Sequence, residues 1–344
     1  MKNRLRSTSP PPWMRSGAMN AIVSFLEQSG LDPVTVVGSE GMRVAEAFDP
    51  YRKVELTAML KAFKKAAEVT GRNDIGLELG LTQQLEGWGP FFFLFTNAPT
   101  VGEAFKDLCR YGAVLQSQAG FQLIDNGERF GIEYTSNHPE LVGWEFDNEI
   151  TIALVMNIVN VLTGSTVIPT QIQFEHQPLS DIKTYKRWLG VTPGFGAANT
   201  AIIYPASLAI RQPHNANPEL YKVLKRHMRD LIEAEVEQDQ LHHVVRNNIG
   251  RGLTQGTATL EHIAAEIGME PRTLQRRLKE EGTSFQVLMD EIRLSRARYY
   301  LEKTRLSITD IALELGYAEA SVFVRAFKRL TGYSPNRYRQ DQFR

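Results

Sequence analysis

Two segments near the C-terminus carry basic and amide side chains at matching positions. Residues 274–279 (LQRRLK) and residues 323–328 (FVRAFK) share the order apolar, any, Arg, any, apolar, Lys. In a helix, apolar residues four apart lie on one face, so the polar residues between them are left for a partner. Arginine can bond guanine O6 and N7 together in the major groove, whereas a lysine near a helix end suits phosphate. These residue types therefore predict DNA as a partner.

A second repeated motif predicts the elements that position these segments. Residues 263–268 (IAAEIG) recur as residues 311–316 (IALELG), 48 residues further on, and each copy reads as a helix that ends at glycine. Pro271 suits the first turn of the following helix, and Ser307 with Asp310 has the form of a capping box. The sequence thus predicts two helix-turn-helix units in an all-α domain over residues 237–344.

The predicted helix from Phe285 to Lys303 would join the two units. At 1.5 Å per residue it spans about 28 Å, near the 34–36 Å between successive major-groove faces, so one chain could read two adjacent grooves. The residues expected to face DNA are Arg272, Thr273, Gln275, Arg276 and Lys279 in the first unit and Ala320, Ser321, Val324, Arg325 and Lys328 in the second.

Residues 17–236 predict an α+β effector-binding or dimerisation domain. Alternating residues 121–124 and 129–134 flank Asn126-Gly127, which favours a hairpin, and further strands are expected at 171–175 and 201–204. A helix should run from the capping residue Thr100 to about Ser117, and another from Pro218 to the inter-domain joint. Residues 1–16 read as a disordered basic leader. Residues 150–162 read as a buried helix, too short to span a membrane.

Composition excludes several classes of function. Net charge is zero, although residues 251–344 hold 16 Lys and Arg against 12 Asp and Glu. The single cysteine, Cys109, cannot form an internal disulfide, which is compatible with the cytoplasm, and no histidine spacing pairs with it as a metal site. No nucleophile elbow, phosphate-binding loop or His-Glu-x-x-His helix is present. We expect no catalytic residue, no cofactor and no metal.

An aromatic cluster raises the question of a ligand. It comprises Trp88, Phe91, Phe92, Phe93 and Phe95, with His138, Trp144 and His176 as possible neighbours. These residues could line a small-molecule pocket, but packing of the domain core explains most of them equally well. The sequence alone therefore assigns no effector site.

The closing residues of the chain resemble the AraC/XylS family of bacterial transcriptional regulators. The similarity lies in Phe323-x-Arg325-x-Phe327-Lys328, Gly332, Pro335 and Tyr338-Arg339. The resemblance places Arg272, Gln275 and Arg276, and then Ala320, Ser321, Val324 and Arg325, at base-reading positions. Two departures are Glu270, where Ser or Thr commonly caps, and the small apolar Ala320 on the reading face.

The N-terminal region resembles the arabinose-binding-like domain of a subgroup that includes ornithine-utilisation and virulence regulators. The similar stretches are residues 66–71, 75–80, 97–104 and 174–176. The resemblance implies a cytoplasmic regulator, usually an activator, that responds to a small-molecule effector, forms a homodimer and contacts RNA polymerase. The alternative is a regulator whose N-terminal domain serves only dimerisation or protein interaction, with the helix from Pro218 to Glu235 as the interface.

Overall fold

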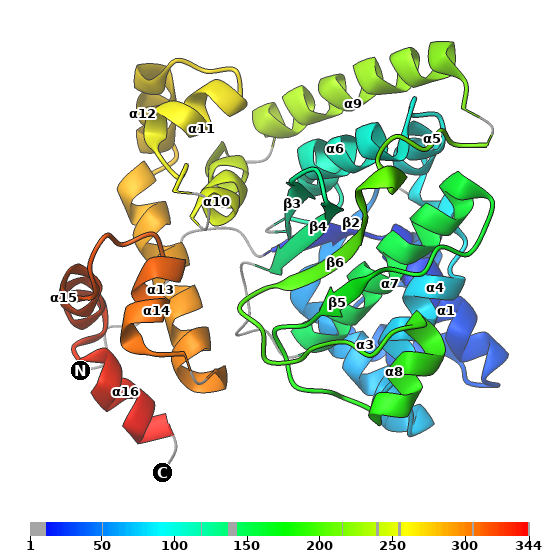
Figure 1. The fold of residues 1–344 in the computed structure, drawn as a ribbon, viewed down its shortest axis with the longest axis horizontal. Coiled ribbons are helices and arrows are strands. Elements are labelled where there is room, and N and C mark those ends of the chain that lie inside the picture. Colours follow the sequence, from blue (N-terminus) through cyan, green and yellow to red (C-terminus); the bar gives the residue numbers. More distant parts are fainter. Residues whose placement is uncertain are drawn as a thin grey trace.

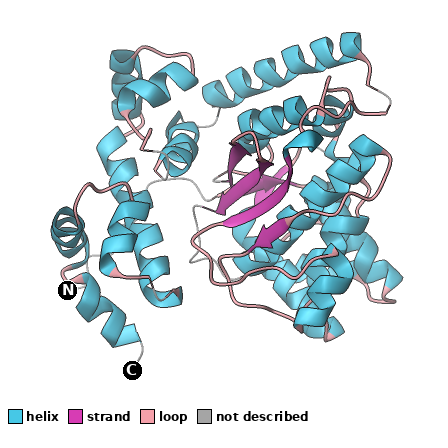
Figure 2. Ribbon diagram, in the orientation of Figure 1, coloured by secondary structure: helices cyan, strands magenta, loops and turns pink. Residues whose placement is uncertain are grey.

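The computed structural model describes residues 12–49, 51–117, 119–136, 143–214, 216–238, 241–253, 256–304 and 306–342. They form two domains, an α+β N-terminal domain and an all-helical C-terminal domain, which confirms the predicted fold class (Figures 1 and 2). Among these residues, no helix is both long and apolar enough to cross a bilayer.

The N-terminal domain has helices around a four-stranded sheet, with a second sheet of two strands (Figure 2). Its strands are β1 (Trp13–Arg15), β2 (Lys53–Glu55), β3 (Ala119–Asp125), β4 (Arg129–Ser136), β5 (Gln171–Gln173) and β6 (Thr200–Pro205). Its α-helices are α1 (Gly17–Gln28), α2 (Pro33–Val36), α3 (Leu56–Thr70), α4 (Ile75–Thr82), α5 (Pro90–Thr96), α6 (Val101–Tyr111), α7 (Trp144–Thr163), α8 (Ile182–Leu189) and α9 (Pro218–Gln238). Short 3-10 turns are η1 (Gly38–Glu40), η2 (Val44–Phe48), η3 (Leu85–Trp88), η4 (Gly112–Val114) and η5 (Ala206–Leu208).

The main sheet has the order β3-β4-β6-β5, and every neighbouring pair is antiparallel. The predicted hairpin is confirmed: Phe121 lies opposite Tyr134, and Gly127 takes a positive φ of 85° at the turn. The Asn126 side chain accepts hydrogen bonds from the backbone N–H groups of Glu128 and Arg129, which stabilises the turn.

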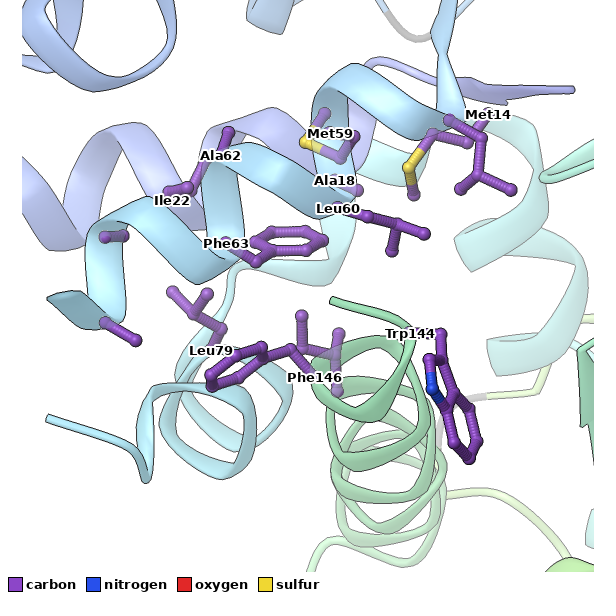
Figure 3. Packing of buried hydrophobic residues seen from close by; sticks show 14 of the residues in the cluster. Met14, Ala18, Ile22, Met59, Leu60, Ala62, Phe63, Leu79, Trp144 and Phe146 are labelled. Atoms are coloured by element: carbon purple, nitrogen blue, oxygen red, sulfur yellow. The ribbon is translucent and has the colours of Figure 1, made fainter. Parts of the chain in front are cut away.

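Helix α7 forms the centre of the N-terminal core. It contacts β4 and β6 on one side and α3 and α4 on the other, so the predicted buried helix is confirmed. Gly80 lets α4 approach closely, since a Cβ at this position would lie 2.4 Å from the Ala153 Cβ. Figure 3 shows Leu60 and Phe63 of α3 packed above Phe146 of α7.

Two expectations about the N-terminal region are wrong. The leader was expected to stay disordered to residue 16, but β1 pairs with β2, and Ser16 is buried. Residues 1–11 lie outside the described part of the chain. Helix α6 ends at Tyr111 instead of about Ser117, and the chain continues as the 3-10 turn η4. Gly112 at this change lies close to a phenyl ring: a Cβ there would lie 2.5 Å from Cδ2 of Phe121.

The C-terminal domain is built on one long helix. Its helices are α10 (Leu241–Gly252), α11 (Leu260–Glu266), α12 (Pro271–Glu280), α13 (Phe285–Lys303), α14 (Ile308–Glu314), α15 (Ala320–Thr331) and α16 (Pro335–Gln342). Helix α13 joins the unit α11–α12 to the unit α14–α15, as expected. The boundary predicted at residue 236 falls within the last turn of α9 and stays a prediction.

Candidate DNA-binding surface and domain interface

The first helix-turn-helix unit forms from local signals. The Thr259 side chain accepts a hydrogen bond from the His262 N–H at the start of α11, and Gly268 makes the turn with a φ of 71°. Pro271 opens α12, although Glu270 at the capping position makes no side-chain cap bond. Leu274 and Leu278 are fully buried, so the other face of α12 is available to a partner.

The residues predicted to contact DNA on α12 lie on that available face. Arg272, Gln275, Arg276 and Lys279 are exposed, and Thr273 is half-buried. Arg276 lies 3.8 Å from the Glu280 carboxylate, and both side chains are mostly exposed. An exposed pair of this kind contributes little and is screened by salt, so Arg276 can exchange Glu280 for another partner.

The second unit repeats this arrangement with a stronger cap. Ser307 and Asp310 form the predicted capping box, and Gly316 makes the turn with a φ of 70°. Phe323 and Phe327 are buried on α15, with ring centroids 5.8 Å apart. These two rings supply the core on which the exposed face of α15 rests.

The predicted residues on α15 divide into two groups. Ser321, Arg325 and Lys328 are exposed, whereas Ala320 and Val324 are half-buried against the hydrophobic core. The Ser321 hydroxyl donates to the Glu319 carboxylate at 3.1 Å. Arg325 therefore has the longest reach on this face, and Val324 offers only part of its surface to a base.

Sequence reasoning missed the side chains that fix the second unit to α13. Arg293 donates to the carbonyl oxygens of Leu315 and Gly316, at 2.9 and 3.1 Å, and its guanidinium lies over the Tyr317 ring. Arg329 pairs with Asp290 at 2.7 Å. The basic residues of this domain therefore include several with structural partners, and composition alone could not separate these from the exposed ones.

Tyr338 and Arg339, the last two residues that carry the family resemblance, have a structural role. The Tyr338 hydroxyl donates to Glu302 at 2.6 Å, and Arg339 donates to the carbonyl oxygens of Leu301 and Leu306. These bonds tie α16 to the end of α13. Together with Arg293, they fix the second unit and α16 to the joining helix.

Helix α13 also contacts the N-terminal domain. The rings of Trp144 and Tyr299 pack edge to face with centroids 5.1 Å apart, and Trp144 contacts His176 in the same way. The Tyr300 hydroxyl donates to the Ala198 carbonyl at 3.4 Å. One hydrophobic cluster therefore includes residues of both domains, which we call the domain interface.

Charged groups are buried beside this aromatic contact. Arg296 of α13 is only 3% exposed, and its charge acts on Glu133 of β4, Glu175 after β5 and Glu314 of α14. Burial raises the pKa of all three carboxyl groups, that of Glu175 to about 8, while Arg296 lowers them. Burial also lowers the pKa of His176 to about 4, so this ring is neutral near pH 7. No sequence pattern signals this cluster, because its members are distant in the chain.

The contribution of Glu175 to stability is expected to fall as the pH rises from about 5 to about 8, whereas that of His176, whose pKa falls from 6.5 to about 4 on folding, rises up to about pH 6.5. Folding raises the pKa of Glu175 from 4.5 to about 8, so the folded chain binds an extra proton in this window. The stabilisation is fully present below the unfolded pKa and is lost as the pH rises through the folded pKa. Glu175→Gln, which stays uncharged, should flatten the dependence of Tm on pH. The same dependence of Tm on pH in the parent chain and in Glu175→Gln would contradict this role of Glu175. Glu149, whose pKa is also raised to about 8, is present in both proteins and contributes equally to both curves.

The aromatic candidates do not share one site. Trp88, Phe91, Phe92 and Phe95 line a pocket in the N-terminal domain, whereas Phe93 is 43% exposed and does not line it. Trp144 and His176 lie at the domain interface instead, and His138 lies outside the described residues. Within the described residues, no group of three or more His, Cys, Asp or Glu side chains could hold a metal ion.

The geometry of the C-terminal domain defines a class of protein. Two helix-turn-helix units, held by one joining helix and each with an exposed second helix, are typical of a tandem helix-turn-helix DNA-binding protein. A family model for a helix-turn-helix domain matches residues 263–341. A second model, described as the arabinose-binding domain of AraC transcription regulators, matches residues 30–212, more than half of the chain. The chain belongs to the AraC family of transcriptional regulators and is not an enzyme.

The chain is similar to known regulators along most of its length. The ornithine utilization regulator of Pseudomonas aeruginosa is 26% identical over 321 residues, which cover 93% of this chain and 94% of that protein. The regulator VirS of Mycobacterium tuberculosis is 28% identical over 293 residues, covering 83% of this chain and 84% of VirS. Among solved structures, transcriptional regulator CdpR from P. aeruginosa is 20% identical with a TM-score of 0.47, covering 94% of this chain and 97% of CdpR. The resemblance proposed from the sequence is confirmed.

Proposed function

We propose that this AraC-family regulator reads a specific DNA sequence through α12 and α15 and is controlled by a small-molecule effector bound to its N-terminal domain. The observation that carries the proposal is the position of these two helices. In Figure 1, α15 lies on the side of α13 that faces away from the N-terminal sheet and α12 lies beyond the upper end of α13, and the polar faces of both helices are exposed. The site of action is the cytoplasm, where bacterial DNA lies.

The proposed contacts follow from side-chain type and exposure. Arg272, Gln275 and Arg276 would read bases in one major groove and Arg325 in the next, with Thr273 and Ser321 as shorter polar contacts. Ala320 and Val324 would present methyl groups to thymine. Lys279 and Lys328, near the ends of their helices, would contact phosphate and fix the register.

The domain interface supports effector control. Helix α13 carries both recognition helices and is held against the N-terminal domain by Tyr299, Tyr300 and Arg296. A ligand that binds one arrangement of this interface more tightly would shift the population toward it and so change the placement of both units on DNA. We extend the proposal to activation through contact with RNA polymerase, which the family resemblance implies.

The alternative, an N-terminal domain used only for dimerisation, also has an observation in its favour. Leu220 and Val223 on α9 are exposed, the latter by 64%, and this is the helix that the sequence proposed as an interface. Light scattering tests this proposal by comparing the molar mass of the full chain with that of its Val223→Glu variant. A dimer that becomes a monomer on substitution supports an interface at α9, and an unchanged mass contradicts it.

Selection of genomic fragments tests DNA reading directly. The full chain should bind particular fragments at least about 10³-fold more tightly than unrelated DNA at physiological salt. Fragments that are retained in proportion to length alone would contradict specific reading and indicate only electrostatic binding.

The lysines are expected to control the salt dependence of binding. Lys279→Ala and Lys328→Ala should each reduce the slope of log K against log salt by about 1, because each removes one phosphate contact. Preference among sequences should stay the same. Lys183→Ala, an exposed lysine on α8, is the control and should leave the slope unchanged. A changed sequence preference with an unchanged slope would assign these lysines to bases instead.

A further inference from the structure

We infer that the effector site is the apolar pocket between α5, α6, β3 and α7, and that its ligand is a small uncharged molecule, mainly apolar, with one hydrogen-bonding group. This inference rests on the proposed effector control and names the class of ligand. Neither the arabinose-binding description of the domain nor the ornithine utilization relative describes such a ligand.

The lining of the pocket excludes most polar ligands. Of its 15 lining residues, only Gln116 and Thr151 carry a side-chain amide or hydroxyl, and none is Lys, Arg, His, Asp or Glu. The indole N–H of Trp88 already donates to Gln83 at 3.0 Å. A sugar would bury several hydroxyl groups here without partners, and a zwitterionic amino acid would bury two charges, each at a cost of several kcal/mol.

The two polar groups lie together and suit a single hydroxyl or carbonyl. Gln116 donates to the Tyr134 hydroxyl at 3.3 Å and to the Asp147 carboxyl at 3.4 Å, both long for hydrogen bonds. Thr151 also bonds to the Tyr134 hydroxyl. A ligand hydroxyl can therefore replace a weak bond of Gln116 while the short bond between Tyr134 and Asp147 stays in place.

The size of the pocket limits the ligand. Its free volume is about 50 Å³, room for about three or four water-sized groups as it stands. Three lining residues, Trp88, Phe92 and Leu154, are half-buried and form the edge that reaches solvent. Entry of a ring-sized molecule requires these side chains to move, which supplies a structural change that depends on the ligand.

The pocket is connected to the domain interface by one strand. Successive side chains of a strand point to opposite faces, and on β4 these are Glu133 and Tyr134. Tyr134 bonds to the polar end of the pocket, whereas Glu133 is acted on by Arg296 of α13. Strand β3, which lines the pocket through Phe121, also contacts α10 of the DNA-binding domain. The pocket is thus next to both contacts with the DNA-binding domain, that of Glu133 with Arg296 and that of β3 with α10.

A series of ligands with one ring and different head groups tests the inference on the full chain. At ten times its Kd, benzyl alcohol should raise the Tm by about 3 to 5 °C, with toluene less effective at equal concentration. Benzoate, benzylammonium, L-arabinose and L-ornithine should cause no shift. A shift with arabinose, ornithine or benzylammonium, or none with benzyl alcohol, would overturn the assignment.

Two variants locate the binding. Leu154→Phe fills the edge of the pocket and should abolish the shift, whereas Leu224→Phe, a half-buried leucine of α9 outside the pocket, should retain it. Thr151→Val keeps the shape and should remove the advantage of benzyl alcohol over toluene, which remains informative if Leu154→Phe does not fold. A shift that persists unchanged in both pocket variants would overturn the site. These Tm measurements contain no DNA, so a negative result would reject the ligand site without bearing on DNA recognition, which the fragment selection tests separately.

Discussion

Replacing Arg296 with methionine is expected to lower the free energy of unfolding by about 3 kcal/mol at pH 9, above the pKa of Glu175, because it leaves ionised buried carboxyl groups without their positive partner. Arg296 is buried at the domain interface, where its charge acts on Glu133, Glu175 and Glu314. Methionine keeps much of the side-chain volume, so the loss reports charge more than packing. Chemical unfolding followed by tryptophan fluorescence measures it.

Two further variants separate charge from general damage at this interface. Arg298→Met, at an exposed position on the same helix, should change stability by less than about 0.5 kcal/mol. Adding Glu175→Gln to Arg296→Met should recover part of the loss, since neighbours that share one cluster are not additive. Additive losses in the double variant would show that Arg296 and Glu175 do not stabilise each other. Amide exchange should also speed up along α13 in Arg296→Met if the helix is released.

Arg276→Ala and Arg325→Ala are each expected to weaken binding to a selected DNA fragment by about 5- to 150-fold. This range corresponds to the 1 to 3 kcal/mol that a bidentate arginine contributes to base discrimination. Both side chains are exposed on their recognition helices, so their removal should leave the fold intact. Fluorescence anisotropy at fixed salt gives the two dissociation constants, with unchanged Tm values as the check on folding.

The two arginines lie on different helices, so their effects should add in the double variant. Arg298→Ala, which is exposed on α13 and not on a recognition helix, is the matched control and should bind within about twofold of the parent chain. Equal weakening on specific and unrelated DNA would contradict base reading and assign both arginines to phosphate.

Local signals explain why the DNA-binding domain could be predicted so closely. Pro271 at the first turn of α12, the Ser307–Asp310 capping box and the glycines at the turns each act within a few residues. The bounds of α12 and α13 were therefore expected from the sequence and are confirmed. The two strands around Asn126-Gly127 were predicted for the same reason.

The errors arise where distant residues decide the structure. Strand β1 forms because β2, about forty residues later, offers its edge, and no local pattern in residues 13–15 signals this. Helix α6 stops where the ring of Phe121 approaches Gly112. The cluster around Arg296 draws on β4, the end of β5, α13 and α14, and the sequence shows these residues only as ordinary charges.

The pocket shows a mixed outcome. The aromatic residues 88–95 indicated either a ligand site or a packed core, and the structure uses Phe91 and Phe95 in both ways, as buried side chains that also line the pocket. The polar end could not be foreseen. Gln116 and Thr151 meet there only because α7 packs against β4 and β6, which follows from the packing of the whole domain.

A footprint on one selected DNA fragment tests the central claim most directly. The parent chain should protect two major-groove patches about one helical turn, 34–36 Å, apart on the same side of the duplex. Arg276→Ala should lose one patch and Arg325→Ala the other, because each arginine belongs to a different recognition helix. A single patch, or the loss of both patches in either variant alone, would contradict the reading of two adjacent grooves by one chain.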